Sequence, residues 1–304
     1  MNKDLTYVLV TPARNEGMYI GDTIRAVVAQ TCRPAKWVIV SDGSTDGTEA
    51  ICQRYSEQHP WIILIRRRAD AERDFAAKVK AFNDGYAELA GINYDIIGNL
   101  DADITFDADY FSFLLERFHG NPSLGVAGTP FMEGGFHYDF RFSSIEHVSG
   151  ACQLFRRKCF EDIGGYKPVK KGGIDWIAVT TARMMGWQTR TFPEKVCYHA
   201  RKMGTAKDDV YGAIFRHGGK DYRLGGHPVW QVFRAVYQMT KKPYFIGGII
   251  LLFGYIYASI RGDERSVSKE LMRFHRGEQM ERLGAMIGRI FPVRRREPEK
   301  RIDA

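Results

Sequence analysis

Short apolar segments alternate with longer amphipathic segments through the first hundred residues. Apolar, β-branched stretches predict strands, and apolar positions three or four residues apart predict helices. The expected strands cover residues 6–11, 36–41, 62–65 and 95–100, and the expected helices cover residues 18–29, 44–55 and 78–89. Strands separated by helical crossovers form a parallel sheet with right-handed connections. We therefore expect an α/β domain with a mostly parallel, doubly wound central sheet.

The pattern is less regular after this point. Further helices are predicted at residues 109–118, 174–185, 208–217 and 229–239, and further strands at residues 124–129, 150–155 and 188–192. Residues 131–138 are rich in glycine and aromatic side chains, which is typical of a loop. The second half therefore predicts a mixed continuation of the sheet, followed by helices.

An apolar run of about 17 residues covers positions 244–260, between Lys242 and Arg261. This length is at the lower limit for a membrane-spanning helix. Basic residues on both sides give no clean orientation. We favour a segment that enters the membrane partly or lies in its plane, with a full span and a buried core helix as alternatives. The apolar positions of residues 267–290, which alternate with Lys and Arg, predict a basic amphipathic helix suited either to an anionic membrane or to packing on the domain.

Composition excludes several classes of protein. The 304 residues carry a net charge of +8, which suits phosphorylated substrates, anionic lipid or nucleic acid. The basic residues are not interleaved with a known RNA or DNA motif, so we expect no nucleic-acid partner. Five cysteines without any C-x-x-C pair argue against a zinc site or a disulfide framework. The first apolar run is too short for a secretory signal, so we expect a cytoplasmic protein with reduced cysteines.

Two pairs of aspartates stand out close together. Asp101 and Asp103 directly follow an apolar strand, where ligands bind in open α/β sheets. Two carboxylates one residue apart can bind a divalent cation that in turn holds phosphate oxygens. Asp107 and Asp109 precede a predicted helix, where aspartate has an ordinary capping role. We expect the first pair to be functional and the second to be structural.

Six motifs occur in the order found in one enzyme family. They are TPARNE at residues 11–16, VSDGSTDGT at residues 40–48, a lysine five residues before Asn83, Asp101-Ala102-Asp103, GGY at residues 164–166 and Asp175 in GIDW. Together they resemble inverting family 2 glycosyltransferases of the GT-A (Rossmann-like) fold over about residues 5–200. Three positions depart from the family pattern: Arg14 replaces an aromatic residue, Ser41 an aspartate and Ile174 a glutamate.

The resemblance implies transfer of a sugar from a nucleotide diphosphate sugar to a saccharide or lipid-linked acceptor. It implies a Mg²⁺ or Mn²⁺ cofactor bound by Asp103, with His199 as a further metal ligand. It also implies that the donor nucleotide contacts the following residues: Pro12, Ala13, Glu16, Asp42, Lys78 and Asp101. Asp42 would accept an N–H of a uracil-like ring, and Asp101 would contact the ribose or a metal-bound water.

Asp175 is the expected catalytic base, which takes the acceptor proton on the face opposite the leaving group. Each of these residues also has an ordinary structural interpretation. Asp175 could cap the helix predicted at residues 174–185, and Asp42 could stabilise its own turn. Lys78 could be a solvated helix residue, and a lone histidine such as His199 is often structural. Asp46 is assigned to the turn.

We therefore predict three parts: a catalytic domain at residues 1–205, a helical linker region at 206–243, and a membrane-contacting region at 244–304. The expected function is surface polysaccharide or glycolipid assembly at the cytoplasmic face of a membrane. One alternative is a haloacid-dehalogenase-like phosphatase, because a strand followed by D-x-D-x-T also describes its nucleophile motif. The other is a non-catalytic, membrane-associated binding module.

Overall fold

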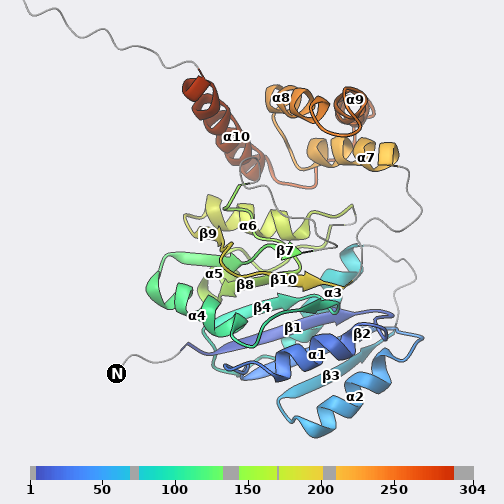
Figure 1. Cartoon of the computed structure of the whole chain (residues 1–304), viewed down its shortest axis with the longest axis vertical. Helices are drawn as coiled ribbons and strands as arrows, with labels where there is room; N and C mark the ends of the chain where they lie inside the picture. Colours follow the sequence, from blue (N-terminus) through green and yellow to red (C-terminus); the bar gives the residue numbers. More distant parts are fainter. Residues whose placement is uncertain (1–4, 69–74, 133–143, 170, 201–209, 291–304) are drawn as a thin grey trace, which may run out of the picture. The chain divides into compact units, whose positions relative to one another are not determined.

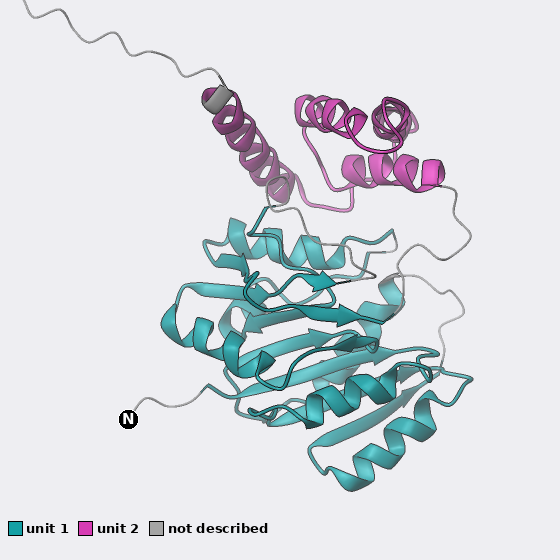
Figure 2. Ribbon diagram, viewed as in Figure 1, with its two compact units in different colours: residues 1–208 teal, residues 209–304 magenta. Residues whose placement is uncertain are grey.

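The computed structural model describes residues 5–68, 75–132, 144–169, 171–200 and 210–290. The chain divides into two compact units, residues 1–208 and 209–304 (Figure 2). This division differs from the three parts expected from the sequence. The helices within residues 206–243 pack against the apolar helix that follows them, so they form part of the second unit instead of a separate linker.

A seven-stranded sheet with the order β3-β2-β1-β4-β8-β6-β9 forms the centre of the first unit (Figure 1). Its strands are β1 (Tyr7–Ala13), β2 (Lys36–Asp42), β3 (Ile62–Arg67), β4 (Ile96–Leu100), β6 (Leu124–Gly128), β8 (Cys152–Arg156) and β9 (Gln188–Thr191). The first four are mutually parallel, whereas β8 runs antiparallel to β4 and β6. The expectation of a mostly parallel sheet is confirmed. The direction of β8 was not predictable, because an apolar run does not encode its direction.

Helices cover both faces of this sheet. One face carries α1 (Ile20–Val28), α2 (Thr48–Gln58) and α4 (Tyr110–Gly120), and the other carries α3 (Phe75–Ala87), α5 (Arg157–Asp162) and α6 (Ile174–Met184). Alternate side chains of β1 enter the two cores, Leu9 on one face and Val10 on the other, as the strand period of two requires. All five cysteines are free and four of them are buried, as the sequence predicted.

A second, three-stranded sheet consists of β5 (Ile104–Thr105), β10 (Cys197–His199) and β7 (Phe131–Met132). The sequence predicted none of these short strands, and β7 begins the stretch expected to be a loop. The rest of that stretch, from residue 133, lies outside the described residues. The small sheet matters because it brings residues 197–199 beside the chain that leaves β4.

The second unit consists of α7 (Val210–Arg223), α8 (Pro228–Met239), α9 (Ile246–Ile260) and α10 (Lys269–Ile290) (Figure 1). The apolar run and the basic run thus both form helices, as expected. Within the described part of the chain, no helix has both the length and the apolar character needed to cross a membrane.

Candidate active site

The aspartates after β4 lie at the carboxyl end of the central sheet. The backbone N–H of Asp101 donates to the carbonyl of Ala151 at 2.9 Å, which fixes the chain as it leaves the strand. Asp103 is buried, with 8% of its surface exposed. Because buried carboxylates need a partner, the surroundings of Asp103 indicate its role.

His199 lies next to this carboxylate, with its Nε2 atom 3.5 Å from Oδ2 of Asp103. The small sheet creates this approach, since His199 pairs with Ile104 and the N–H of Ala200 donates to the carbonyl of Asp103 at 3.0 Å. Carboxylate and imidazole are ligands that suit Mn²⁺ and, less often, Mg²⁺. Within the described ranges, no cluster of three or more His, Cys, Asp or Glu side chains could hold a metal ion. A cation here would therefore need water or substrate oxygens as well, which is the usual way Mg²⁺ binds beside phosphates.

Lys78 extends from α3 towards the same strand end and places its Nζ atom 2.5 Å from Oδ1 of Asp101. Partial burial alone would lower the pKa of Lys78. The carboxylates of Asp101, Asp175 and Asp103 outweigh this effect and raise the pKa above its ordinary value. Lys78 is therefore a charged member of an acidic cluster, and the interpretation as a simple solvated lysine does not account for its surroundings.

Asp175 lies in the first turn of α6 and not at its cap. The capping position belongs to Gly173, whose φ of 94° is left-handed, so the expectation that Asp175 could cap the helix is wrong. The side chain of Asp175 lies over Gly150, where an added Cβ would be 3.0 Å from the Cβ of Asp175. Asn99, in β4, donates from Nδ2 to the carbonyl of Gly150 at 2.9 Å. Asn99 thus links Gly150, the residue beneath Asp175, to the strand that the aspartate pair follows.

The GGY motif places a buried tyrosine near Asp175. Gly164 and Gly165 both have positive φ, and the turn they form buries Tyr166. The Tyr166 hydroxyl donates to Oε1 of Gln153 at 2.6 Å, and Nε2 of Gln153 donates to the carbonyl of Val148 at 2.7 Å. Burial, with a smaller contribution from nearby carboxylates, raises the pKa of Tyr166 well above its usual value. Sequence reasoning identified the motif but not the role of Gln153, which has no local sequence signal.

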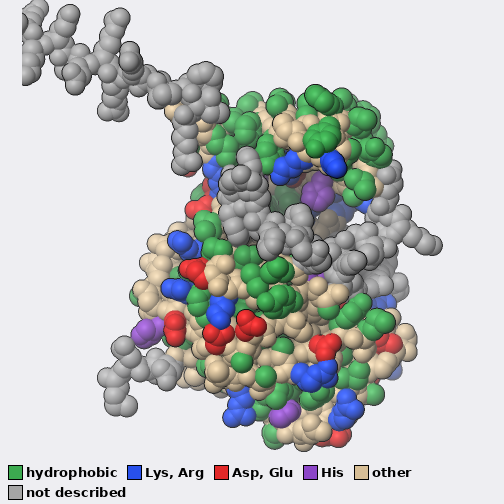
Figure 3. Space-filling model, in the orientation of Figure 1, with side chains coloured by type: hydrophobic (Ala, Val, Ile, Leu, Met, Phe, Trp, Pro, Cys, Tyr) green, Lys and Arg blue, Asp and Glu red, His purple; other side chains and the backbone are tan. Residues whose placement is uncertain are grey.

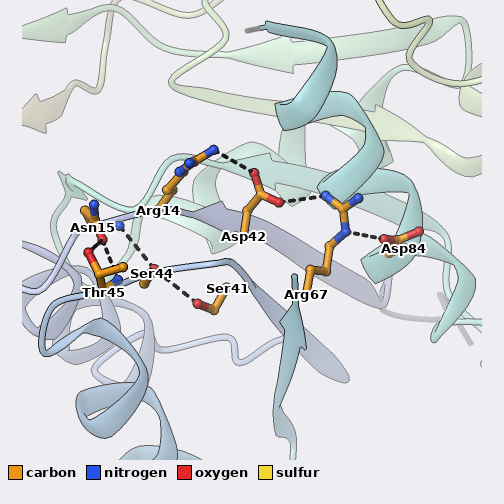
Figure 4. A network of polar contacts seen from close by, with 8 residues as sticks. All are labelled: Arg14, Asn15, Ser41, Asp42, Ser44, Thr45, Arg67 and Asp84. Atoms are coloured by element: carbon orange, nitrogen blue, oxygen red, sulfur yellow. Dashed lines mark hydrogen bonds and ion pairs between the residues drawn. The ribbon is translucent and has the colours of Figure 1, made fainter. Parts of the chain in front are cut away.

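Asp42 ends β2 and belongs to a network of charged side chains (Figure 4). Arg67 donates from Nη1 to Oδ1 of Asp42 at 2.9 Å, and its Nε atom lies 2.5 Å from Oδ2 of Asp84. Nη1 of Arg14 is 3.8 Å from Oδ2 of Asp42, which is too long for a hydrogen bond, and this nitrogen is buried without a hydrogen-bond partner. Asp42 therefore accepts a hydrogen bond from one guanidinium group and lies beside a second, and it is not a self-contained turn residue. Sequence reasoning missed Arg67.

The loop after β1 is held to the loop after β2 by hydrogen bonds from its backbone N–H groups to side chains. The N–H of Glu16 donates to Oγ1 of Thr48 at 2.8 Å, and the N–H of Gly17 donates to Oδ2 of Asp46 at 2.9 Å. Oδ1 of Asp46 also accepts from the N–H of Thr48 at 3.0 Å, which confirms its structural assignment. Pro12 and Ala13 are the last residues of β1, next to this loop.

The second aspartate pair has the structural position expected of it. Asp109 directly precedes α4, but its side chain makes no capping hydrogen bond and instead pairs with Lys195, with 2.5 Å between Oδ1 and Nζ. This contact is the main cause of the lowered pKa of Asp109. The pair thus lies where predicted, with an ion pair in place of the expected cap.

Comparisons with known proteins find glycosyltransferases that are similar to this chain. Residues 8–145 match the model of a family described as Glycosyl transferase family 2. A poly-β-1,6-N-acetyl-D-glucosamine synthase of Staphylococcus epidermidis is 23% identical over 236 residues, which cover 71% of this chain and 53% of the relative. The chain therefore spans about half the length of this curated relative.

Solved structures share the fold. A mannosyltransferase from Pyrobaculum calidifontis, in complex with GDP-Man and Mn²⁺, has a TM-score of 0.55 at 18% identity and covers 96% of this chain and 83% of its own. Residues 1–349 of TarS from S. aureus, in complex with UDP-GlcNAc, have a TM-score of 0.53 at 14% identity, covering 93% and 81%. The fold of the first unit is GT-A. The resemblance seen in the motifs agrees with the match to glycosyl transferase family 2, which covers residues 8–145 of this chain.

Proposed function

We propose that the chain is a metal-dependent, inverting glycosyltransferase that moves a sugar from a nucleotide diphosphate to an acceptor hydroxyl. The observation that carries this proposal is the grouping of Asp103 with His199, and of Asp101 with Lys78, just beyond β4. A carboxylate and an imidazole suit a divalent cation, and a fixed ammonium suits a phosphate. Asp175 lies close enough to this group to contribute to the pKa of Lys78.

The donor's diphosphate gains negative charge as its bond to the sugar breaks, so the site must offset that charge. Asp103 and His199 would hold Mg²⁺ or Mn²⁺, which when bound would supply Lewis-acid neutralisation of the leaving group. Lys78 would contribute a second positive charge, held in place by Asp101. The mannosyltransferase that shares this fold contains Mn²⁺ together with GDP-Man, which supports the same requirement here.

Asp175 would act as the base. The acceptor oxygen attacks the anomeric carbon from the face opposite the diphosphate, the bond from that carbon to the phosphate oxygen breaks, and the hydroxyl proton passes to the Asp175 carboxylate. A single displacement from the face opposite the leaving group inverts the configuration of the anomeric carbon. Gly150 supports this role, because it leaves room for Asp175 beside the chain that follows β4.

The nucleobase would lie against Asp42 and its two arginines. A carboxylate that accepts next to a guanidinium that donates matches a ring edge with an N–H beside a carbonyl, as in uracil. Guanine has the same pair of groups on one edge. Pro12, Ala13 and Glu16 would line the nucleotide from the adjoining loop, whose conformation is fixed by contacts such as the Glu16–Thr48 hydrogen bond.

The acceptor would be a saccharide or a lipid-linked saccharide in surface polysaccharide or glycolipid assembly. The synthase relative forms poly-β-1,6-N-acetyl-D-glucosamine, which supports a polysaccharide product. The chain would work at the cytoplasmic face of a membrane, which its second unit would contact. The net charge of +8 suits the anionic lipids of that surface.

A panel of nucleotide-sugars tests the chemistry. We expect Mn²⁺-dependent binding of one donor and slow transfer of its sugar to water. Asp175→Asn should retain donor binding and lower turnover by about 10²- to 10⁴-fold, the usual contribution of a general base. Asp109→Asn, which changes an aspartate outside the site, is the matched control. Loss of donor binding in Asp175→Asn would contradict the assignment of Asp175 as the base.

The same assays separate the two alternatives. A phosphatase would release phosphate from monoesters without using any nucleotide-sugar, with Asp101 as nucleophile. A non-catalytic module would keep its cellular role in the Asp175→Asn and Asp103→Ala variants. The family match and the GT-A fold both favour transfer.

A further inference from the structure

The helix α9 approaches α7 and α8 closely through glycines, and several of its large apolar residues are exposed. A Cβ added to Gly254 would lie 2.1 Å from the carbonyl oxygen of Phe215 in α7, and one added to Gly248 would lie 2.2 Å from that of Ala235 in α8. The backbones therefore touch with no side chain between them. In water-soluble helices the large apolar residues usually face the partner helix. Close approach through glycine is instead typical of helices in lipid.

The opposite side of α9 continues into an exposed apolar surface on α8, which we call the outer face. Its members are all at least 42% exposed: Val229, Val232, Val236, Ile249, Phe253, Ile256 and Ile260. The α8 residues repeat at intervals of three and four, and so do those of α9, so each set forms one stripe. Figure 3 shows hydrophobic side chains gathered over these two helices. A contiguous apolar surface of this kind marks an interaction site.

The charges around the outer face indicate its partner. Residues 228–260 contain no aspartate or glutamate, and their basic residues are Arg234, Lys241 and Lys242. Arg234 pairs with Asp221 of α7, and the two lysines lie between α8 and α9. Lys241 lies over the ring of Tyr237, with its Nζ 4.5 Å from the centroid. An acid-free apolar surface bordered by cations and tyrosines suits an anionic lipid surface.

We infer that the outer face of α8 and α9 lies in the plane of an anionic phospholipid bilayer. The inference deepens the membrane location proposed above and rests on it, but not on the transfer chemistry. α9 has 15 residues and is about 22 Å long, which is shorter than the roughly 30 Å of hydrocarbon that a spanning helix must cross. Immersion of the outer face removes its apolar side chains from water, while α7 remains on the aqueous side of α9.

The sequence predicted a membrane-contacting segment at residues 244–260 and a basic amphipathic helix over residues 267–290. In α10, Leu271 and Leu283 are buried within the unit, and the large apolar residues exposed among those described are Met280 and Ile287. α8, in contrast, had no membrane role in the sequence interpretation. The lipid surface is therefore made by α8 together with α9.

Flotation of the full chain with vesicles tests this inference. We expect binding to vesicles of phosphatidylcholine with phosphatidylglycerol. The double substitution Ile249→Glu/Phe253→Glu should lower the partition coefficient at least about tenfold, because two apolar side chains no longer enter the lipid. Met280→Glu/Ile287→Glu, the matched control on α10, should stay within about twofold of the original. Lys241→Gln/Lys242→Gln should remove about tenfold or more of the preference for anionic over neutral vesicles.

Three results would overturn the inference: no flotation of the original chain, undiminished flotation of the α9 variant, or lipid-free dimers that the α9 variant dissociates. The last result would assign the outer face to a second copy of the chain. Ile249→Ser/Phe253→Ser provides a milder variant if the glutamates disturb folding, which circular dichroism detects. Donor binding with Mn²⁺, measured on the same preparations, shows separately whether the proposed catalytic function holds.

Discussion

Gly150 is the residue whose lack of a side chain matters most for the candidate site. An added Cβ would lie 3.0 Å from Cβ and 3.2 Å from Oδ2 of Asp175, which is closer than most such contacts, so Asp175 would have to shift by a few tenths of an ångström. The carbonyl of Gly150 is meanwhile held by Asn99 from β4. Because the backbone is fixed on one side, the strain of a larger residue would fall on Asp175.

We therefore expect Gly150→Ala to lower kcat by about 10- to 100-fold and to change donor affinity by less than about threefold. A small displacement of a base has a large effect on proton transfer but little effect on nucleotide contacts. Steady-state kinetics and nucleotide titration measure the two quantities. Gly120→Ala is the control, since nothing lies within 4 Å of a Cβ at that position. An equal loss of affinity and kcat would show that Gly150 serves donor binding instead.

Lys78 gives a prediction about pH. Its pKa is raised above 10.5 in the folded protein, so its charge persists below that value and is lost only as the pH rises beyond it. Metal-free affinity for a nucleoside diphosphate should therefore not decline between about pH 7 and pH 9 through loss of this charge. Lys78→Met should weaken binding throughout this range, and Lys78→Arg should restore part of it. Calorimetric titration at several pH values measures the effect, and an unchanged Lys78→Met variant would contradict it.

At the scale of elements, the short strand β10 decides whether the two candidate metal ligands meet. Asp103 follows β4 and His199 comes almost a hundred residues later. The antiparallel pairing of β10 with β5 brings them within 3.5 Å. Strands of two or three residues have no detectable period, so a sequence pattern cannot reveal them.

The contact between α7 and α9 is the other decisive pairing of elements. Gly254→Val would place a branched side chain against the backbone of Phe215, and neither helix backbone can move aside without opening the pair. We expect a loss of stability of about 1–3 kcal/mol in the second unit, the usual effect of overpacking. Urea unfolding followed by circular dichroism measures it. Gly277→Ala, which meets nothing within 4 Å, is the control and should not lower the stability, because alanine favours a helix interior more than glycine does.

At the scale of the whole molecule, the proposed active site joins segments from most of the first unit. A donor and a cation bound to Asp101, Asp103 and His199 would bridge β4 and β10 in the folded state only. Such a ligand stabilises the folded state by about 2.7 kcal/mol at a concentration of 100 times its Kd.

We therefore expect Mn²⁺ with a nucleoside diphosphate to raise the melting temperature by several degrees, and a chelator to reverse the shift. The Asp103→Asn variant should show a much smaller increase. Thermal unfolding with nucleotide alone, metal alone and both together measures the coupling. A shift that is equally large in Asp103→Asn would place the cation elsewhere.

The sequence by itself determined the α/β architecture, the position of most helices and strands of the first unit, and the family motifs. These features are encoded locally: an apolar period reports which face of a segment is buried, and Asp101 follows its strand directly in the chain. For the same reason the prediction that Asp107 and Asp109 precede a helix was correct, since α4 begins at Tyr110.

Only the tertiary structure decided the rest, because those features depend on which distant segments pair. Tertiary pairing brings Arg67 to Asp42 and His199 to Asp103. It also places the side chain of Asp175 against Gly150. The tertiary structure also turned the glycines of α9 towards α7 and α8, buried Leu251 and Tyr255, and left Ile249, Phe253, Ile256 and Ile260 exposed. Composition alone identifies residues 244–260 as apolar, but which of those side chains face a partner is fixed by packing.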